Sequence, residues 1–130
     1  MKTNVVSVVA AAAAVICSVP AVAHHSFNSV FDRERPIEFV GRVTKVEWMN
    51  PHVWFYIDVE NEQGDIEKWS FEMGSPNGLI RRGWNHKSLE VGQVVTVVGA
   101  QARDGSQRGS VRTVTLPTGE SLFGAQNDSR

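Results

Sequence analysis

A stretch of seven residues, 53–59, alternates between two kinds of side chain and limits the folds that this chain can adopt. Its apolar positions are Val53, Phe55, Ile57 and Val59. A period of two puts this apolar set on one face of a β-strand, because successive side chains of a strand point to opposite faces. The segment therefore predicts a sheet with one buried face, and it leaves Trp54 and Tyr56 on the other face.

Four other segments have the pattern of strands. They are residues 37–48, 66–73, 94–100 and 111–116, with a short pairing segment expected at 122–123. In the first of them the apolar positions change parity after Gly41, which predicts a bulge or a sharp bend at that glycine. Asn50-Pro51 and Asp104-Gly105 are typical turn sequences, so we expect the chain to reverse at both places.

A short helix is predicted after the third strand. Ser75 suits the N-cap and Pro76 suits the first helical position, while Gly83 suits the left-handed cap at the other end. Five strands with a helix between the third and the fourth follow the order of an OB-fold. The predicted fold class is therefore mainly β, a small five-stranded OB-fold-like β-barrel, with a small β-sandwich as the alternative.

The N-terminus has the layout of a cleaved signal peptide. Lys2 supplies the positive charge, residues 5–16 form an apolar run, and Ala21-Val22-Ala23 is the pattern that signal peptidase recognises. The run of 12 residues is shorter than the roughly 20 that a membrane-spanning helix needs. We predict export to the periplasm, with this division: signal peptide 1–23, N-terminal arm 24–35, barrel domain 36–124 and polar tail 125–130.

Removing 23 of the 130 residues leaves 107, enough for one domain, and takes away the single cysteine, Cys17. The remainder has no disulfide and no thiol chemistry. Without Lys2 it carries 12 basic and 14 acidic residues, which argues against nucleic acid as a partner, since nucleic-acid binding needs a basic surface. The sequence contains no nucleophile elbow, Cys–His pair, phosphate-binding glycine loop or HExxH helix, so we expect a binding protein rather than an enzyme.

Four motifs occur in an order that resembles a family of small exported bacterial proteins classed only as a domain of unknown function. They are His24-His25-Ser26-Phe27, residues 41–52 with Glu47-Trp48 and Asn50-Pro51-His52, residues 72–84 with Glu72-Met73-Gly74-Ser75-Pro76-Asn77, and Asp104-Gly105-Ser106. The resemblance covers nearly all of the mature chain. It implies export and an OB-like barrel, and it implies no activity, substrate or catalytic residue.

Cleavage would make His24 the first residue of the mature protein. Its α-amine and imidazole can then chelate one metal ion, and a third nitrogen from His25 or His52 would complete the set that copper(II) favours. An amine with a pKa of about 8 is partly deprotonated at neutral pH, which allows this chelation. Met73 or Glu72 would add a weak ligand. The alternative is that the two N-terminal histidines are a frayed end and that His52 fixes its own turn.

A second hypothesis is a metal-free interaction module. Trp54, Tyr56 and Trp48 would form an aromatic face that docks a periplasmic protein or a saccharide, as such faces do in many OB barrels. Packing against another part of the chain is the alternative role for these rings. A third hypothesis is a hydrolase that uses the paired carboxylates Glu47 and Glu72, although carboxylates on strand faces are more often simply solvated.

Overall fold

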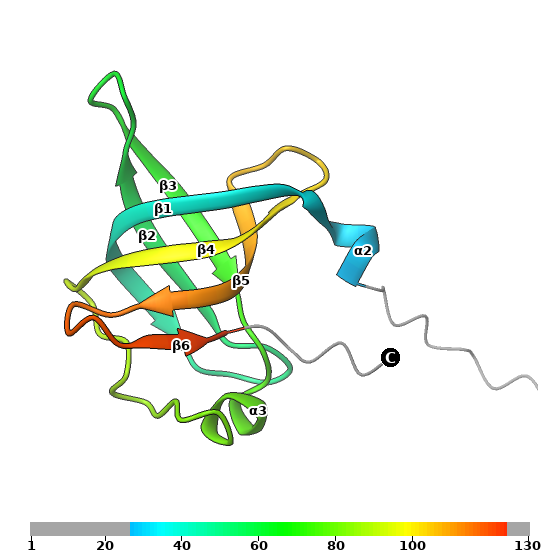
Figure 1. The fold of residues 1–130 in the computed structure, drawn as a ribbon, viewed down its shortest axis with the longest axis vertical. Coiled ribbons are helices and arrows are strands. Elements are labelled where there is room, and N and C mark those ends of the chain that lie inside the picture. The colour runs from blue at the N-terminus through cyan, green and yellow to red at the C-terminus, as the bar shows by residue number, and fades with distance from the viewer. Residues whose placement is uncertain (1–26, 125–130) are drawn as a thin grey trace, which may run out of the picture.

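Six strands and two short helices make up residues 27–124, the part of the chain that this computed structural model describes (Figure 1). In chain order they are α2 (Phe27–Val30), β1 (Phe31–Glu47), β2 (Trp54–Glu60), β3 (Ile66–Glu72), α3 (Pro76–Ile80), β4 (Val94–Ala102), β5 (Arg108–Thr115) and β6 (Ser121–Phe123). The predicted five strands and short helix are therefore present. No helix in this range is long and apolar enough to cross a membrane.

The strands form one sheet that closes on itself. Their order is β3-β2-β1-β4-β5-β6, and β3 also pairs with β5, so that five strands make a ring and β6 extends it beside β5. The β3–β5 pairing is parallel and short, from Ser70↔Arg108 to Glu72↔Ser110, while the other pairings are antiparallel. This closure confirms the OB-fold-like barrel, because the two sheets of a sandwich would not join in a ring.

The long strand β1 serves both halves of the barrel. It pairs with β4 from Phe31 to Arg42 and with β2 from Arg42 to Glu47, bending around the barrel between the two (Figure 1). The strand begins six residues before the expected start at Ile37, so part of the predicted arm belongs to the sheet. Phe31 explains the extension, because its side chain is buried against Ala100 and Ala102 of β4.

The bulge predicted at Gly41 lies two residues later, where the β1–β2 register shifts between Val43 and Lys45. Gly41 itself stays in register, and its role is close approach. A Cβ at this position would lie 2.8 Å from the carbonyl oxygen of Asp58 and 2.8 Å from Ile57. The apolar parity therefore changes at the bulge, while the glycine lets β1 cross β2 closely.

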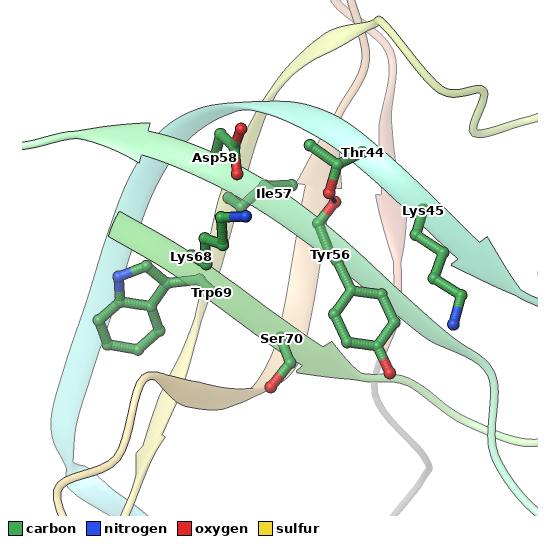
Figure 2. Close-up of a pocket in the computed structure, with 8 residues that line it drawn as sticks. All are labelled: Thr44, Lys45, Tyr56, Ile57, Asp58, Lys68, Trp69 and Ser70. Atoms are coloured by element: carbon green, nitrogen blue, oxygen red, sulfur yellow. Dashed lines mark hydrogen bonds between the residues drawn. The ribbon is translucent and has the colours of Figure 1, made fainter. Parts of the chain in front are cut away.

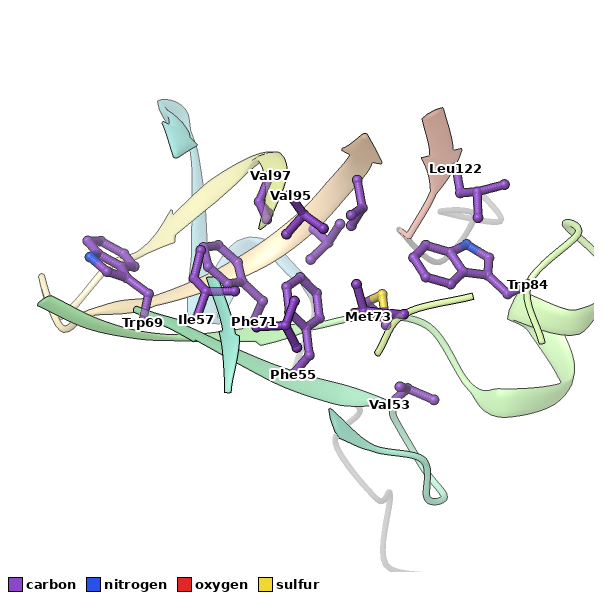
Figure 3. Close-up of a cluster of buried hydrophobic side chains, with 14 of the residues drawn as sticks. Val53, Phe55, Ile57, Trp69, Phe71, Met73, Trp84, Val95, Val97 and Leu122 are labelled. Carbon is purple, nitrogen blue, oxygen red and sulfur yellow. The ribbon is translucent and has the colours of Figure 1, made fainter. Parts of the chain in front are cut away.

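The apolar face of β2 lines the barrel as its alternation predicted. Figure 3 shows Phe55 and Ile57 pointing to the same interior as Phe71 of β3 and Val95 and Val97 of β4, and all five are at most 1% exposed. Burying each such side chain contributes roughly 1.5–3 kcal/mol. Because one face of β2 and β3 is buried in the core, only the opposite face of these strands is available to contact a ligand or another part of the chain.

Trp84 and α3 close one end of the barrel. Ser75 caps the helix by accepting a hydrogen bond at 3.2 Å from the backbone N–H of Gly78, as its position predicted. Gly83 has a φ of +95°, the left-handed conformation expected after the helix. The indole N–H of Trp84 donates to the carbonyl of Phe123 at 2.9 Å, so the ring joins the α3 end to β6.

Candidate functional site

The outer face of the barrel carries two rows of polar and aromatic side chains across β1, β2 and β3. The strand registers place Glu47, Trp54 and Glu72 in one row and Lys45, Tyr56 and Ser70 in the next. These positions alternate with the buried set, so their side chains lie outside the core. The first row contains two carboxylates, Glu47 and Glu72, and each of them has two partners.

Glu72 holds the first of these carboxylates. One of its oxygens is hydrogen-bonded to Nδ1 of His52, and the other accepts a hydrogen bond at 2.9 Å from Nη2 of Arg108. The Glu72 side chain is only 14% exposed. When the imidazole is neutral, donation from Nδ1 to a carboxylate leaves the lone pair on Nε2, which is the arrangement found at most metal-binding histidines.

Arg108, the first residue of β5, lies close to two aromatic rings. The centre of its guanidinium group is 4.9 Å from the ring centroid of Trp54 and 5.3 Å from that of Phe31. Its Nε atom is buried and has no hydrogen-bond partner within residues 27–124. Cation–π attraction to the two rings therefore adds to the hydrogen bond that holds Arg108 at Glu72.

The N-terminal arm is attached beside this cluster. Arg103, in the β4–β5 turn, donates from Nε to the carbonyl oxygen of Asn28 at 2.6 Å, and its backbone N–H donates to Val30 at 2.9 Å. Nη1 of the same arginine lies 3.5 Å from Asp32. The helical turn α2 is thus fastened to the loop that leads into β5 and Arg108. The described part of the arm is ordered against the barrel.

Glu47 holds the second carboxylate. It forms an ion pair with Lys45 and accepts a hydrogen bond at 2.8 Å from the hydroxyl of Tyr56. The hydrogen bond with Lys45 and then that from Tyr56 lower the pKa of Glu47 below its ordinary value. The same carboxylate raises the pKa of Tyr56, since it stabilises the protonated phenol. This cluster is local, because all three residues belong to adjacent positions of β1 and β2.

A groove of about 420 Å³ lies beside the Glu47 cluster on the same outer face. Its lining comes from β1, β2 and β3, and consists of Thr44, Lys45, Tyr56, Ile57, Asp58, Lys68, Trp69 and Ser70 (Figure 2). Figure 2 shows Lys68 beside Asp58, its partner in the β2–β3 register. The lining includes two lysines, the carboxylate of Asp58 and the hydroxyls of Thr44, Tyr56 and Ser70, so the groove offers hydrogen-bond partners to a polar ligand.

Comparison with known proteins places the chain in a family. It belongs to a family of unknown function, DUF6152. The match spans residues 11–112, and it confirms the resemblance that the four sequence motifs suggested. No curated protein matches the chain.

In three dimensions this DUF6152 member is similar to Rim1, a mitochondrial single-stranded DNA binding protein from S. cerevisiae. The TM-score is 0.49 and the sequence identity 12%, and the similarity covers 63% of this chain and 92% of the Rim1 chain. At this level the likeness concerns the fold and not the ligand.

The residues predicted for a metal site fall into three groups. His24 and His25 lie outside the described residues. His52 and Glu72 lie together, whereas Met73 is 3% exposed in the core and is therefore separated from them. Among residues 27–124, no three His, Cys, Asp or Glu side chains form a group that could hold a metal ion by themselves.

The predicted aromatic face is divided. Trp54 and Tyr56 share the outer face of β2, as their parity indicated. Trp48 instead follows β1, packs partly against the core, and has its ring 4.7 Å from that of His86. No local pattern singled out Arg108, because only the β3–β5 pairing brings it to Glu72.

The two carboxylates of the hydrolase hypothesis lie on β1 and β3, and β2 separates them. Glu47 and Glu72 lie on either side of Trp54, at two strand spacings, or about 10 Å between backbones. Each carboxylate is already bonded to a cation and to a second donor. The geometry therefore offers no shared acid–base pair.

Proposed function

We propose that this protein is an exported copper(II)-binding module that carries or buffers the metal in the periplasm. The ligands would be the α-amine and the imidazole of His24, which cleavage after Ala23 would make the first residue. His52 would supply the third nitrogen, with His25 as the alternative donor. Nitrogen sets of this kind suit the tetragonal geometry of copper(II). The signal-peptide pattern of residues 1–23 supports export and the exposed amine.

The observation that carries the proposal is the state of His52. Its Nδ1 is bonded to a carboxylate that an arginine holds in place, and metal-ligating histidines almost always have such a carboxylate or carbonyl partner. The bond to Glu72, 20 residues away, orients the ring from another strand.

The ligand set requires the arm to reach His52. The helical turn α2 begins at Phe27, three residues after His24, and three extended residues span at most about 11 Å. Phe31, which follows α2, lies against Arg108, Arg108 is bonded to Glu72, and Glu72 is bonded to His52. The proposal therefore predicts that His24 lies beside the His52 imidazole when copper is bound.

The test is a copper(II) titration of protein processed in the periplasm, with its N-terminus verified by intact mass. The matched control has one alanine inserted after the cleavage site, which blocks chelation by the His24 amine and leaves the barrel unchanged. We expect the native protein to bind one equivalent tightly with a nitrogen-rich electron paramagnetic resonance signal, and the extended protein to lose this binding. Weak or superstoichiometric binding by the native protein, or equal binding by both, would contradict the proposal.

The groove of Figure 2 favours a second candidate, a metal-free module that binds a saccharide on the outer face. Its hydroxyls and matched charges, together with the half-exposed ring of Tyr56, suit a neutral polyhydroxyl ligand. This candidate predicts that Tyr56→Ala weakens retention on an oligosaccharide array and that the inserted alanine has no effect. Retention that Tyr56→Ala leaves unchanged would exclude this face.

A further inference from the structure

We infer that this protein forms a homodimer in which the outer face of β1 and β4 packs against the same face of a second copy. The inference goes beyond the proposed function and does not depend on copper binding. Two observations carry it, namely the exposed apolar side chains of this face and the opposite charges that flank them.

The outer face of β1 and β4 exposes apolar side chains. Val95 and Val97 of β4 are buried, and the residues that alternate with them point outward. Val40 of β1 is 60% exposed and Val94 of β4 is 43% exposed, while Phe123 of β6, 62% exposed, extends the face across β5 (Figure 1). Such exposed apolar positions on one sheet face are typical of contact surfaces between proteins. The register pairs six residues here, which we call the dimer face: Glu38 with Val98, Val40 with Thr96, and Arg42 with Val94.

The charges of the dimer face complement those of a second copy. Glu38 and Arg42 lie two residues before and two residues after Val40 on β1. A two-fold axis that passes beside Val40, parallel to the sheet and perpendicular to its strands, places each Glu38 opposite Arg42 of the second copy. Packed sheets are about 10 Å apart, a gap that a glutamate and an arginine reaching toward each other can span. Nη1 of Arg42 donates to the carbonyl oxygen of Gly92 at 2.7 Å, which restrains this side chain.

The apolar positions obey the same symmetry. Because β4 runs antiparallel to β1, Val98 lies beside Glu38 and Val94 lies beside Arg42. The axis that matches the charges therefore also places Val98 opposite Val94 of the second copy, with Val40 against its own equivalent. Each contact then occurs twice, as a two-fold interface requires. A different protein would not need the two ends of this face to complement each other, so we assign it to a second copy.

The dimer face is separate from the groove and from the Glu72 cluster. β1 pairs with β4 as far as Arg42 and with β2 from Arg42 onward. Asp58 of β2 neighbours Arg42 and is in turn opposite Lys68 of β3, so it belongs to the groove. We therefore expect ligand binding on β2 and β3 to be the same in monomer and dimer, and a failure of the copper titration leaves this inference standing.

The experiment is sedimentation velocity of the exported protein at concentrations from about 1 µM to about 1 mM, the range in which small interfaces dissociate. We expect native protein to be a dimer at the upper end. Val40→Lys puts two ammonium groups together at the axis, and Glu38→Arg creates two pairs of like charges. Each should weaken the dimer about tenfold or more. Glu62→Arg is the matched control, since it makes the same charge change at an exposed turn and should leave the dimer unchanged.

Mixing two charge variants tests the pairing itself. Glu38→Arg and Arg42→Glu should each fail to dimerise alone, and an equimolar mixture should dimerise, because both pairs are again of opposite charge. Circular dichroism checks the fold of each variant. Val40→Lys decides the matter if Arg42→Glu does not fold, because Val40 is exposed. Native protein that stays monomeric at about 1 mM overturns the inference, as does a dimer that Val40→Lys leaves intact or that Glu62→Arg weakens as much as Glu38→Arg.

Discussion

Two carboxylates on the same face of the barrel are used in different ways. Glu47 bonds to Lys45 and Tyr56, which are two and nine residues away; the Glu47 side chain is 24% exposed and that of Lys45 is 59% exposed. Glu72 bonds to His52 and Arg108, which are 20 and 36 residues away; the Glu72 side chain is 14% exposed and that of Arg108 is 39% exposed. The Glu47 cluster involves only the neighbouring strands β1 and β2. The Glu72 cluster joins three separate parts of the chain, namely the end of β3, the loop before β2 and the start of β5.

The difference shows what an arginine close to two aromatic rings adds to an ion pair. A lysine on an exposed strand presents a mobile point charge, and such pairs contribute little to stability. Arg108 has two rings within 5.3 Å of its guanidinium carbon, and its planar group gives the hydrogen bond to Glu72 a preferred direction. A preferred direction can be passed on to a third residue, and this is why we assign the proposed metal site to the Glu72 cluster.

The largest expected contrast is between Glu72→Ala and Glu47→Ala. Removing Glu72 leaves the partly buried Arg108 without its carboxylate, and we expect a loss of about 2 kcal/mol in the free energy of unfolding. Glu47→Ala should cost clearly less, because Lys45 is exposed to water. Urea unfolding monitored by tryptophan fluorescence measures both, and equal losses would mean that the two clusters have the same structural weight.

A smaller contrast is expected between the two rings of the outer face of β2. Trp54→Ala removes one of the two rings that lie close to the Arg108 guanidinium group, whereas Tyr56→Ala removes a ring beneath the exposed Lys45. We expect Trp54→Ala to destabilise the protein by about 1 kcal/mol more than Tyr56→Ala. Trp54→Phe is the control, since it keeps a ring under the guanidinium group. A larger loss of stability for Tyr56→Ala than for Trp54→Ala would mean that the Glu47 cluster contributes more to stability than the Glu72 cluster.

The smallest expected effect is a pH dependence that belongs to the Glu47 cluster. The pKa of Glu47 is lower in the folded protein than its ordinary value of 4.5. Its contribution to stability is therefore complete above about pH 5 and is lost as the pH falls through the folded-state pKa. The stability difference between native protein and Glu47→Gln should shrink between about pH 5 and pH 3 in urea titrations. A difference that stays constant over this range would show that the carboxylate gains nothing from Lys45 and Tyr56.

Local patterns in the sequence predicted most of the fold. The alternation from Val53 to Val59 assigned β2 and its faces, and Ser75 with Pro76 located the start of α3. These signals are local, because strand parity and helix caps depend on residues a few positions apart. The position of the bulge was predicted wrongly, because the role of Gly41 depends on a contact between strands and not on a local pattern. Gly41 looked irregular, but its lack of a side chain serves contact with Asp58 and Ile57 on another strand.

The candidate site was only partly predictable. His52 and Glu72 were both named from the sequence, one as a ligand and the other as an extra ligand or acid, but nothing in the sequence paired them. Met73 was named together with Glu72. It is the next residue along the chain, so its side chain points to the opposite side, into the core. Adjacent residues of an extended chain point to opposite sides, so neighbours in sequence were separated and distant residues were brought together.

The sequence by itself determined that the chain is mainly β, that one face of β2 is apolar, and that Trp54 and Tyr56 lie on the other face. Its motifs also indicated the family to which the chain belongs. Only the tertiary structure decided that Arg108 meets Glu72, that the rings of Phe31 and Trp54 lie close to Arg108, and that the arm is fastened to the β4–β5 turn. The physical reason is closure of the barrel: the parallel pairing of β3 with β5 forms only when all five strands are in place, and it sets contacts that no local pattern encodes.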